Sequence, residues 1–188
     1  MSVANFDDHS AKIASNMTEL IGQTPMVYLS ARTNKTHAKI ALKLEGENPM
    51  ASVKDRLAMS IILNAEKDGL ITPGKTTLVE ATSGNTGIAL AQIGAARGYK
   101  VIITMPETMS QERRALLSIF GAEVHLTAAA AGLKGALFKA NQITDALGEN
   151  GYMCRQFDSK YNALIHKETT GPEILKQTQG DVAAAVGG

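Results

Sequence analysis

The sequence has 188 residues and a formal net charge of +1, with 19 Lys or Arg against 18 Asp or Glu. This balance argues against a charged disordered tail and against a nucleic-acid-binding surface, which needs many basic groups to neutralise phosphates. The single cysteine, Cys154, excludes an intrachain disulfide framework and a multi-thiolate metal site. The length predicts one domain, or one domain and part of a second.

The sequence also lacks targeting and metal-binding patterns. No apolar run approaches the ~18 residues of a membrane span. The first ten residues contain no basic segment followed by an apolar stretch, so no secretory signal is expected. The four histidines are scattered, with no two at metal-ligand spacing on a predicted helix. We therefore expect a soluble cytoplasmic protein that binds no metal, nucleic acid or membrane.

Predicted secondary structure begins with a helical turn over 18–21 and two short strands over 26–30 and 39–45. Helices and strands then alternate, and four of the helices are followed directly by a glycine, a common helix terminator. Ser52 and Asp55 have a spacing related to the capping box, which marks the start of the first long helix. The predicted helices cover 53–68, 86–97, 110–120, 133–147 and 168–178. The predicted strands cover 76–81, 100–105, 123–127, 152–156 and 181–186.

This alternation predicts an α/β fold, in which right-handed crossovers join parallel strands and helices cover both faces of the sheet. Ligands of such sheets bind beyond the carboxyl ends of the strands. Each crossover helix begins at that same edge. We therefore expect Lys54, the loops 82–87 and 106–110, and Gln156 to share one edge of the sheet.

The loop 82–87, Thr-Ser-Gly-Asn-Thr-Gly, lies between a predicted strand and a predicted helix. Its two glycines give conformational freedom, and its hydroxyl and amide groups surround the unpaired N–H groups of a helix start. Such a turn suits an anion, particularly a carboxylate. The alternative is a cluster of helix-capping residues, although capping needs only one such side chain. We favour the ligand site.

Lys54 lies in the first turn of a predicted helix, where the helix dipole is unfavourable for a cation. That field, with Arg56 nearby, favours the neutral amine that Schiff-base chemistry and proton abstraction need. The alternative, slightly favoured on residue types alone, is a solvated lysine offset by Asp55. Cys154 is expected to be a buried inert thiol. Arg113 and Arg114 are expected to form a solvated helix face.

With these motifs in place, the sequence resembles the cysteine synthase (O-acetylserine sulfhydrylase) family of fold-type II, pyridoxal-phosphate-dependent enzymes. The resemblance runs with few gaps from about residue 17 to 188. It is carried by several motifs in register, namely NPMASVKDR at 48–56, EATSGNTG at 80–87, TMP at 104–106, MS at 109–110, ERR at 112–114, QF at 156–157 and TTGPEI at 169–174. Cystathionine β-synthases share the lysine and Thr-Ser-Gly-Asn motifs.

The resemblance implies a two-domain fold with parallel sheets flanked by helices. Residues 1–44 would belong to the large domain and 45–157 would form a complete small α/β domain. Residues 158–188 would begin the core of the large domain. In the family, the strand that matches 182–186 leads into a glycine-rich turn that holds the cofactor phosphate. Because the sequence stops at Gly188, we expect the large domain to be incomplete and the chain alone to bind the cofactor poorly and to be inactive.

The resemblance also implies roles for single residues. Lys54 would attach to pyridoxal 5′-phosphate and later remove the substrate α-proton. Asn85 would hydrogen-bond the 3′-oxygen of the cofactor. The substrate carboxylate would be held by the loop and by one residue after a later strand. These substrate-binding residues would be Thr82, Ser83, Asn85, Thr86 and Gln156.

The implied reaction replaces the acetoxy group of O-acetylserine with sulfide and yields L-cysteine and acetate. The implied partners are these small molecules, a second copy of the full-length chain and the C-terminal tail of a serine acetyltransferase. Two alternatives stay open: a truncated, non-catalytic paralogue that acts as a binding module, and a cystathionine β-synthase-like β-replacement enzyme. Nothing before Ser2 resembles a haem-binding segment, which mildly favours cysteine synthase over the latter.

Overall fold

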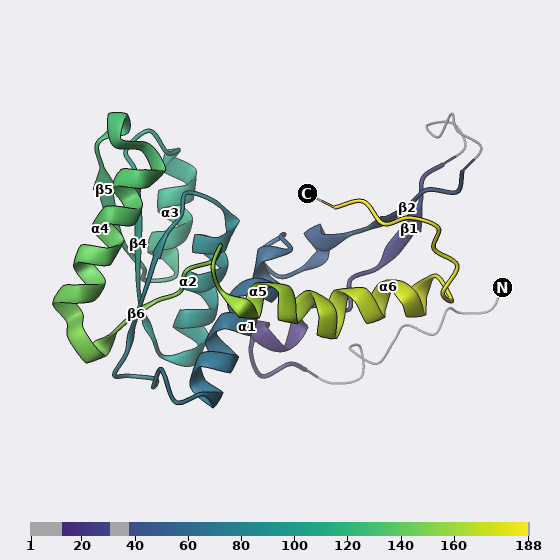
Figure 1. Ribbon diagram of the computed structural model, residues 1–188, viewed down its shortest axis with the longest axis horizontal. Helices are drawn as coiled ribbons and strands as arrows, with labels where there is room; N and C mark the ends of the chain where they lie inside the picture. The colour runs from purple at the N-terminus through teal and green to yellow at the C-terminus, as the bar shows by residue number, and fades with distance from the viewer. Residues whose placement is uncertain (1–12, 31–37, 188) are drawn as a thin grey trace.

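The computed structural model describes residues 13–30 and 38–187, and its largest element is a parallel sheet of four strands. The strands are β3 (Thr77–Ala81), β4 (Lys100–Pro106), β5 (Glu123–Thr127) and β6 (Gly151–Met153). Their order across the sheet is β5-β4-β3-β6, and every neighbouring pair is parallel. The α/β fold predicted from the alternation is therefore confirmed (Figure 1).

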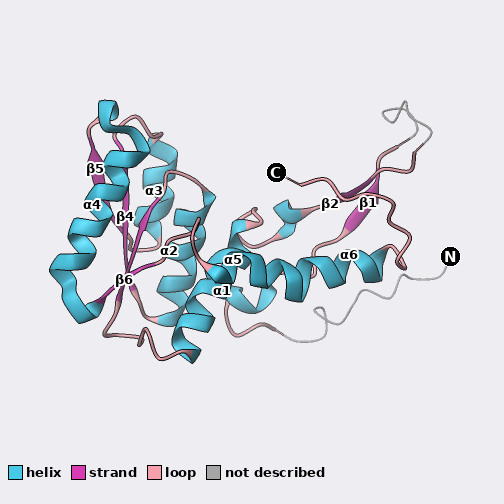
Figure 2. Cartoon of the chain, viewed as in Figure 1, coloured by secondary structure: helices cyan, strands magenta, loops and turns pink. Residues whose placement is uncertain are grey.

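Helices cover both faces of this sheet. They are α1 (Lys54–Lys67), α2 (Asn85–Arg97), α3 (Gln111–Ile119) and α4 (Gly132–Leu147). Helix α4 packs alone on one face, against β3, β4 and β6, while α2 and α3 lie on the other face, with α1 packed against α2 (Figure 2). Each of these helices begins and ends within one residue of its predicted bounds.

The two faces of the sheet have separate cores because side chains alternate along each strand. Leu78 and Ile103 point into the larger core, which α1 and α2 complete with a set of buried aliphatic residues. Val79 and Ile102 point the other way, onto α4. There the small side chains Ala136 and Ala140, four residues apart on one helix face, let α4 lie close to the sheet.

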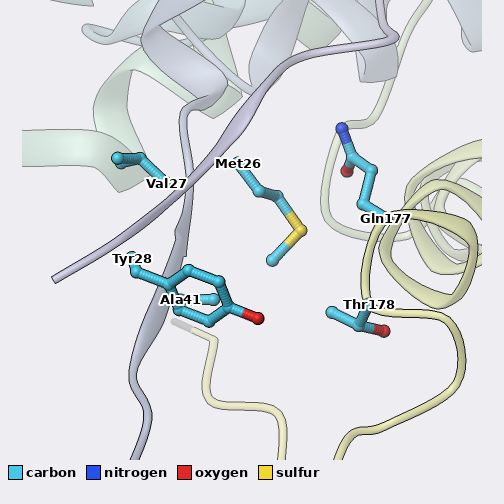
Figure 3. A pocket seen from close by; sticks show the side chains of 6 residues that line it. All are labelled: Met26, Val27, Tyr28, Ala41, Gln177 and Thr178. Carbon is cyan, nitrogen blue, oxygen red and sulfur yellow. The ribbon is translucent and has the colours of Figure 1, made fainter.

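A second group of elements lies away from the sheet. An antiparallel pair, β1 (Met26–Tyr28) and β2 (Ala41–Lys43), lies beside α6 (Gly171–Gln177) (Figure 1). A shallow pocket of about 230 Å³ lies between the strand pair and the end of α6 (Figure 3). Its lining includes Met26, Tyr28, Gln177 and Thr178. A 3₁₀ helix at Met17–Leu20 precedes the pair and matches the predicted helical turn.

The final helical region differs from the prediction. It begins earlier, with α5 (Lys160–Ile165), and continues through a π-helix, His166–Thr170, into α6. The start of α5 carried a recognisable signal, because Ser159 is its N-cap and its side-chain oxygen accepts the N–H of Tyr161 at 3.3 Å.

The predicted strand over 181–186 is wrong. Residues 181–187 follow α6 as irregular, exposed chain, and Val186 is almost fully exposed. No strand among the described residues pairs with this segment. A strand forms only where a neighbour accepts its backbone hydrogen bonds, so the apolar sequence of 181–186 does not suffice.

A buried ion-pair network joins the two groups of elements. The guanidinium of Arg56 on α1 is 1% exposed and bonds Glu45 on one side, at 2.8 Å from Nε to Oε2. On the other side it bonds Glu173 of α6, at 2.6 Å from Nη1 to Oε1. Lys43 of β2 also contacts Glu173, at 2.7 Å. Helix α1, strand β2 and helix α6 are thereby held together by charge-assisted hydrogen bonds.

The network predicts acid sensitivity through Glu173. Burial by itself raises the pKa of Glu173, but hydrogen bonds from Arg56 and Lys43 outweigh it and lower the pKa from 4.5 to about 2. A lowered pKa means that the ionised form adds stability above pH 4.5, and that this stability is lost as the pH falls towards 2. Urea unfolding between pH 7 and pH 2.5 should show a larger loss of stability for the wild type than for Glu173→Gln. Parallel pH profiles for the two proteins would contradict this assignment.

Candidate functional site

The candidate site lies where the direction of the sheet reverses. The chain steps from β3 to β4 and then to β5, and α4 carries it back to β6 on the opposite side of β3. Crossovers on the two sides of such a point leave a crevice at the carboxyl ends of the strands, which is the usual ligand position in open parallel sheets. The corresponding position in this sheet, called the crevice below, lies between the segment 82–87 after β3 and the segment 154–158 after β6.

The loop 82–87 is anchored to the sheet and leaves the start of α2 free of a side-chain cap. The N–H of Thr82 donates to the carbonyl of Thr104 at 3.1 Å, and the N–H of Gly84 donates to Thr82 Oγ1 at 3.2 Å. Gly84 itself is the N-cap residue, and no side chain hydrogen-bonds the helix start. The alternative that this loop is a capping cluster is therefore wrong. None of its polar side chains is used to cap α2.

Thr86 and Gln156, which lie 70 residues apart in the sequence, meet in the crevice. The hydroxyl of Thr86 donates to Gln156 Oε1 at 2.6 Å, and both side chains are buried. Two contacts hold the main chain of Gln156. Its N–H donates to Glu80 Oε2 at 3.0 Å and its carbonyl accepts from Asn162 Nδ2 at 3.1 Å. The predicted convergence of these two segments at one sheet edge is confirmed.

The other predicted residues of the loop differ in exposure and contacts. Thr82 is buried, Ser83 is half-buried and Asn85, the first residue of α2, is exposed. The carbonyl of Ser83 accepts a hydrogen bond from Arg113 Nη1 of α3 at 2.9 Å. Arg114 donates likewise to the carbonyl of Glu107. Arg113 is exposed, as expected, and Arg114 is half-buried, but both guanidinium groups also fasten loops at the carboxyl edge.

Lys54 is the first residue of α1 and is half-buried. Its backbone N–H donates to Ser52 Oγ at 3.1 Å. The carboxylate of Asp55 accepts the N–H of Met50 at 2.6 Å rather than completing the expected capping box with Ser52. This contact holds the turn 48–52, in which Ala51 has the left-handed φ of 54°.

The amine of Lys54 makes no hydrogen bond or ion pair with any residue of 13–30 or 38–187, so no such bond joins it to the loop 82–87. Asp55 forms no ion pair with this amine. His166 of the π-helix is close enough to feel its charge. Burial lowers the pKa of His166 first, and the positive charges of Arg56 and Lys54 lower it further.

Two other features of the site region concern Cys154 and Glu80. Burial raises the pKa of the Cys154 thiol well above its ordinary value, which agrees with the expected inert role. Glu80 was not predicted as a site residue, although a single carboxylate within the apolar strand Thr77–Ala81 was a visible signal.

In the described segments there is no group of three or more His, Cys, Asp or Glu side chains that could hold a metal ion. Nor is any described helix long and apolar enough to span a membrane.

Comparison with known proteins gives consistent matches. A family model described as pyridoxal-phosphate dependent enzyme matches residues 17–188. Cysteine synthase 3 of Caenorhabditis elegans is 52% identical over 164 residues, which cover 87% of this chain and 48% of that protein. The crystal structure of a cysteine synthase from Entamoeba histolytica aligns with a TM-score of 0.87 at 40% identity, covering 97% of this chain and 54% of the other.

An O-acetylserine-dependent cystathionine β-synthase from Helicobacter pylori aligns with a TM-score of 0.82 at 34% identity, covering 88% of this chain and 54% of the other. The chain thus spans about half the length of each of these relatives.

Proposed function

Because the chain belongs to the family of pyridoxal-phosphate-dependent enzymes, we propose that it serves cysteine synthesis. The proposed reaction replaces the acetoxy group of O-acetylserine with sulfide and gives L-cysteine and acetate. The observation that carries this proposal is the buried Thr86–Gln156 pair beside an uncapped helix start at the reversal of the sheet. An amino-acid carboxylate is the group that such a crevice suits best.

The donors in this crevice fit a carboxylate. Since Gln156 Oε1 already accepts from Thr86, its Nε2 group is left to donate, and no described residue accepts from it. Thr82 Oγ1 accepts from Gly84, so its own hydroxyl hydrogen is likewise left to donate. Ser83 and the first N–H groups of α2 supply further donors. We assign Thr82, Ser83, Asn85, Thr86 and Gln156 to the substrate carboxylate.

The residues also fit pyridoxal 5′-phosphate at its reactive carbonyl. The amine of Lys54 is half-buried and bonded to no described residue, so it is available for covalent attachment. The exposed amide of Asn85 is available to donate to the 3′-oxygen of the cofactor. When bound, the cofactor supplies an electron sink for the carbanion formed at the substrate α-carbon. Lys54 holds the cofactor and, once released, takes the proton from that carbon.

We further propose that residues 45–157 form a small domain that closes on the site, and that 1–44 and 158–188 belong to a large domain. The arrangement in Figure 1 supports this division, since the sheet body stands apart from β1, β2 and α6. Family membership supports a homodimer in the cytoplasm and docking of the C-terminal tail of a serine acetyltransferase. The match to an O-acetylserine-dependent cystathionine β-synthase favours a second candidate, in which a thiol of homocysteine type replaces sulfide.

The attachment of the cofactor tests the proposal directly. Because the chain alone is expected to bind it poorly, pyridoxal 5′-phosphate is supplied in large excess. The protein is then reduced with borohydride, and the modified lysine is located by peptide mass spectrometry. We expect modification of Lys54, loss of it in Lys54→Ala and no change in Lys67→Ala, which alters an exposed lysine at the end of the same helix. Formation of cysteine from O-acetylserine and sulfide is then measured. Attachment at another lysine would contradict the proposed site, and product only with homocysteine would favour the second candidate.

The hydroxyl of Thr86 gives a separate prediction. Thr86→Val removes the hydrogen bond to Gln156 and leaves a buried amide oxygen unpaired, which should weaken O-acetylserine binding about tenfold. Attachment of the cofactor to Lys54 should not change. Titration calorimetry with O-acetylserine measures the affinity, and Thr72→Val, an exposed threonine before β3, is the matched control. Equal affinities of Thr86→Val and the wild type for O-acetylserine would show that Thr86 does not contribute to substrate binding.

A further inference from the structure

Glu80 is the only charged residue of β3, and its side chain is 2% exposed. It points to the same face of the sheet as Leu78, next to the core that contains Cys154. Burial raises the pKa of Glu80 to about 7, although backbone N–H donors from Gln156, Ala81 and Arg155 oppose that rise and Asp158 adds to it. A carboxylate kept in such surroundings is often functional.

Glu80 accepts hydrogen bonds at the point where the backbone hydrogen bonds between β3 and β6 end. The last of those backbone bonds runs from the N–H of Cys154 to the carbonyl of Val79, at 2.9 Å. At Arg155 the chain turns away with a left-handed φ of 52°. Glu80 Oε2 then accepts the N–H of Gln156 at 3.0 Å, and Oε1 accepts the N–H of Ala81 at 3.0 Å. The carboxylate thus takes the place of a strand neighbour at the end of β6.

These bonds close a ring around the crevice. From Glu80 the chain passes through the loop 82–87 to Thr86, whose hydroxyl bonds Gln156, and the N–H of Gln156 returns to Glu80. Breaking the Glu80 contact would free the main chain of Gln156 at its kink. Its side-chain amide would then lose its fixed direction towards the crevice.

We propose that Glu80 is a positioning residue, which acts through Gln156 to set the affinity of the site for the carboxylate of its amino-acid substrate. The identity of the ligand in this inference rests on the proposed function. The contact between Glu80 and Gln156 is independent of the proposed function. The two parts are therefore tested by separate measurements.

The first measurement is amide hydrogen exchange of Gln156, which needs neither cofactor nor substrate. Glu80→Gln keeps the size of the side chain but places an NH₂ group where one carboxylate oxygen accepted an N–H. We expect the Gln156 amide to exchange at least tenfold faster in this variant. Glu149→Gln, an exposed carboxylate near the opposite end of β6, should exchange as the wild type does. An unchanged rate in Glu80→Gln would overturn the proposal.

The second measurement separates positioning from a merely structural role. By titration calorimetry in excess pyridoxal 5′-phosphate, Glu80→Gln should weaken O-acetylserine binding about tenfold, with Lys54 still modified by the cofactor. In a Gln156→Ala background, Glu80→Gln should weaken binding no further, because the two act in series. An unchanged affinity, or additive effects of the two substitutions, would overturn the proposal.

The remaining outcomes are also decisive. If Glu80→Gln does not fold, Glu80→Asp replaces it, and the same loss of amide protection and of O-acetylserine affinity is expected from its shorter reach. If the wild type binds no O-acetylserine, the proposed function fails by itself. The role of Glu80 is then decided by the exchange rate of the Gln156 amide alone, since a faster rate in Glu80→Gln supports the contact and an equal rate rejects it.

Discussion

Replacement of Arg56 with leucine is expected to lower the free energy of unfolding by about 3–5 kcal/mol, because it breaks a buried ion pair from one side. Arg56 makes charged hydrogen bonds to both Glu45 and Glu173, with further bonds at 3.2 Å to Thr24 and Thr169. Without the guanidinium, Glu45 would lose its only ion-pair partner among the described residues and Glu173 would keep only Lys43. The loss should reach Lys54 as well, since it precedes Arg56 by two residues on α1.

Urea unfolding at pH 7 measures this effect, and Arg97→Leu is the matched control. Arg97 also binds a carboxylate bidentately, that of Glu66, but its side chain is 31% exposed. Exposed pairs contribute about 0–1 kcal/mol, so this control should lose little stability. Similar losses in both variants would show that burial of the Arg56 network adds nothing.

Gly94→Ala is the second substitution with a large expected effect. A Cβ atom at Gly94 of α2 would lie 2.4 Å from Cγ2 of Val101 in β4, far inside normal contact. Val101 is buried and β-branched, so rotation of its side chain about χ1 is restricted. Overpacking of this kind lowers stability by about 1–3 kcal/mol, which exceeds the ~1 kcal/mol that alanine gains over glycine in a helix.

A second substitution should reverse the loss. In Val101→Ala the offending methyl group is absent, so Gly94→Ala should cost less in that background than in the wild type. Thermal unfolding of the four proteins in this cycle measures the coupling. Gly46→Ala, where a Cβ would meet nothing within 4 Å, should change stability by no more than about 0.5 kcal/mol. Additivity of the two substitutions would mean that α2 and β4 are not in tight contact at this point.

The regular part of the fold could be predicted because the local signals agree with the tertiary structure. Each crossover helix between β3 and β6, like α1 before β3, has a glycine just beyond its end, and β5 occupies the predicted residues 123–127. Where pairing depends on distant chain, prediction failed. Strand β6 ends at Met153 rather than at residue 156, because Arg155 turns and Glu80 captures the next free N–H. The segment 181–186 has the composition of a strand but pairs with no described strand.

The candidate site was predictable to the extent that sheet geometry controls it. Thr86 and Gln156 follow parallel strands that are direct neighbours, so their approach follows from the topology. The contact of Arg113 with the Ser83 carbonyl depends on how α3 packs, which no local pattern encodes. Glu80 was missed because a carboxylate in a buried strand has meaning only once the kink at Arg155 is known. The attachment role of Lys54 remains a prediction.

The π-helix His166–Thr170 has a consequence for how the two groups of elements are aligned. Helix α5 is fixed to α1 on one side, where Ser60 Oγ donates to the Tyr161 carbonyl at 3.0 Å. Helix α6 is fixed on the other, where Glu173 meets Arg56. A π turn holds more residues than an α turn, and one extra residue rotates everything after it by about 100° around the helix axis. The π-helix therefore sets the rotation of α6 relative to α5. With this rotation, the continuous helical segment can contact α1 both at Ser60 and at Arg56.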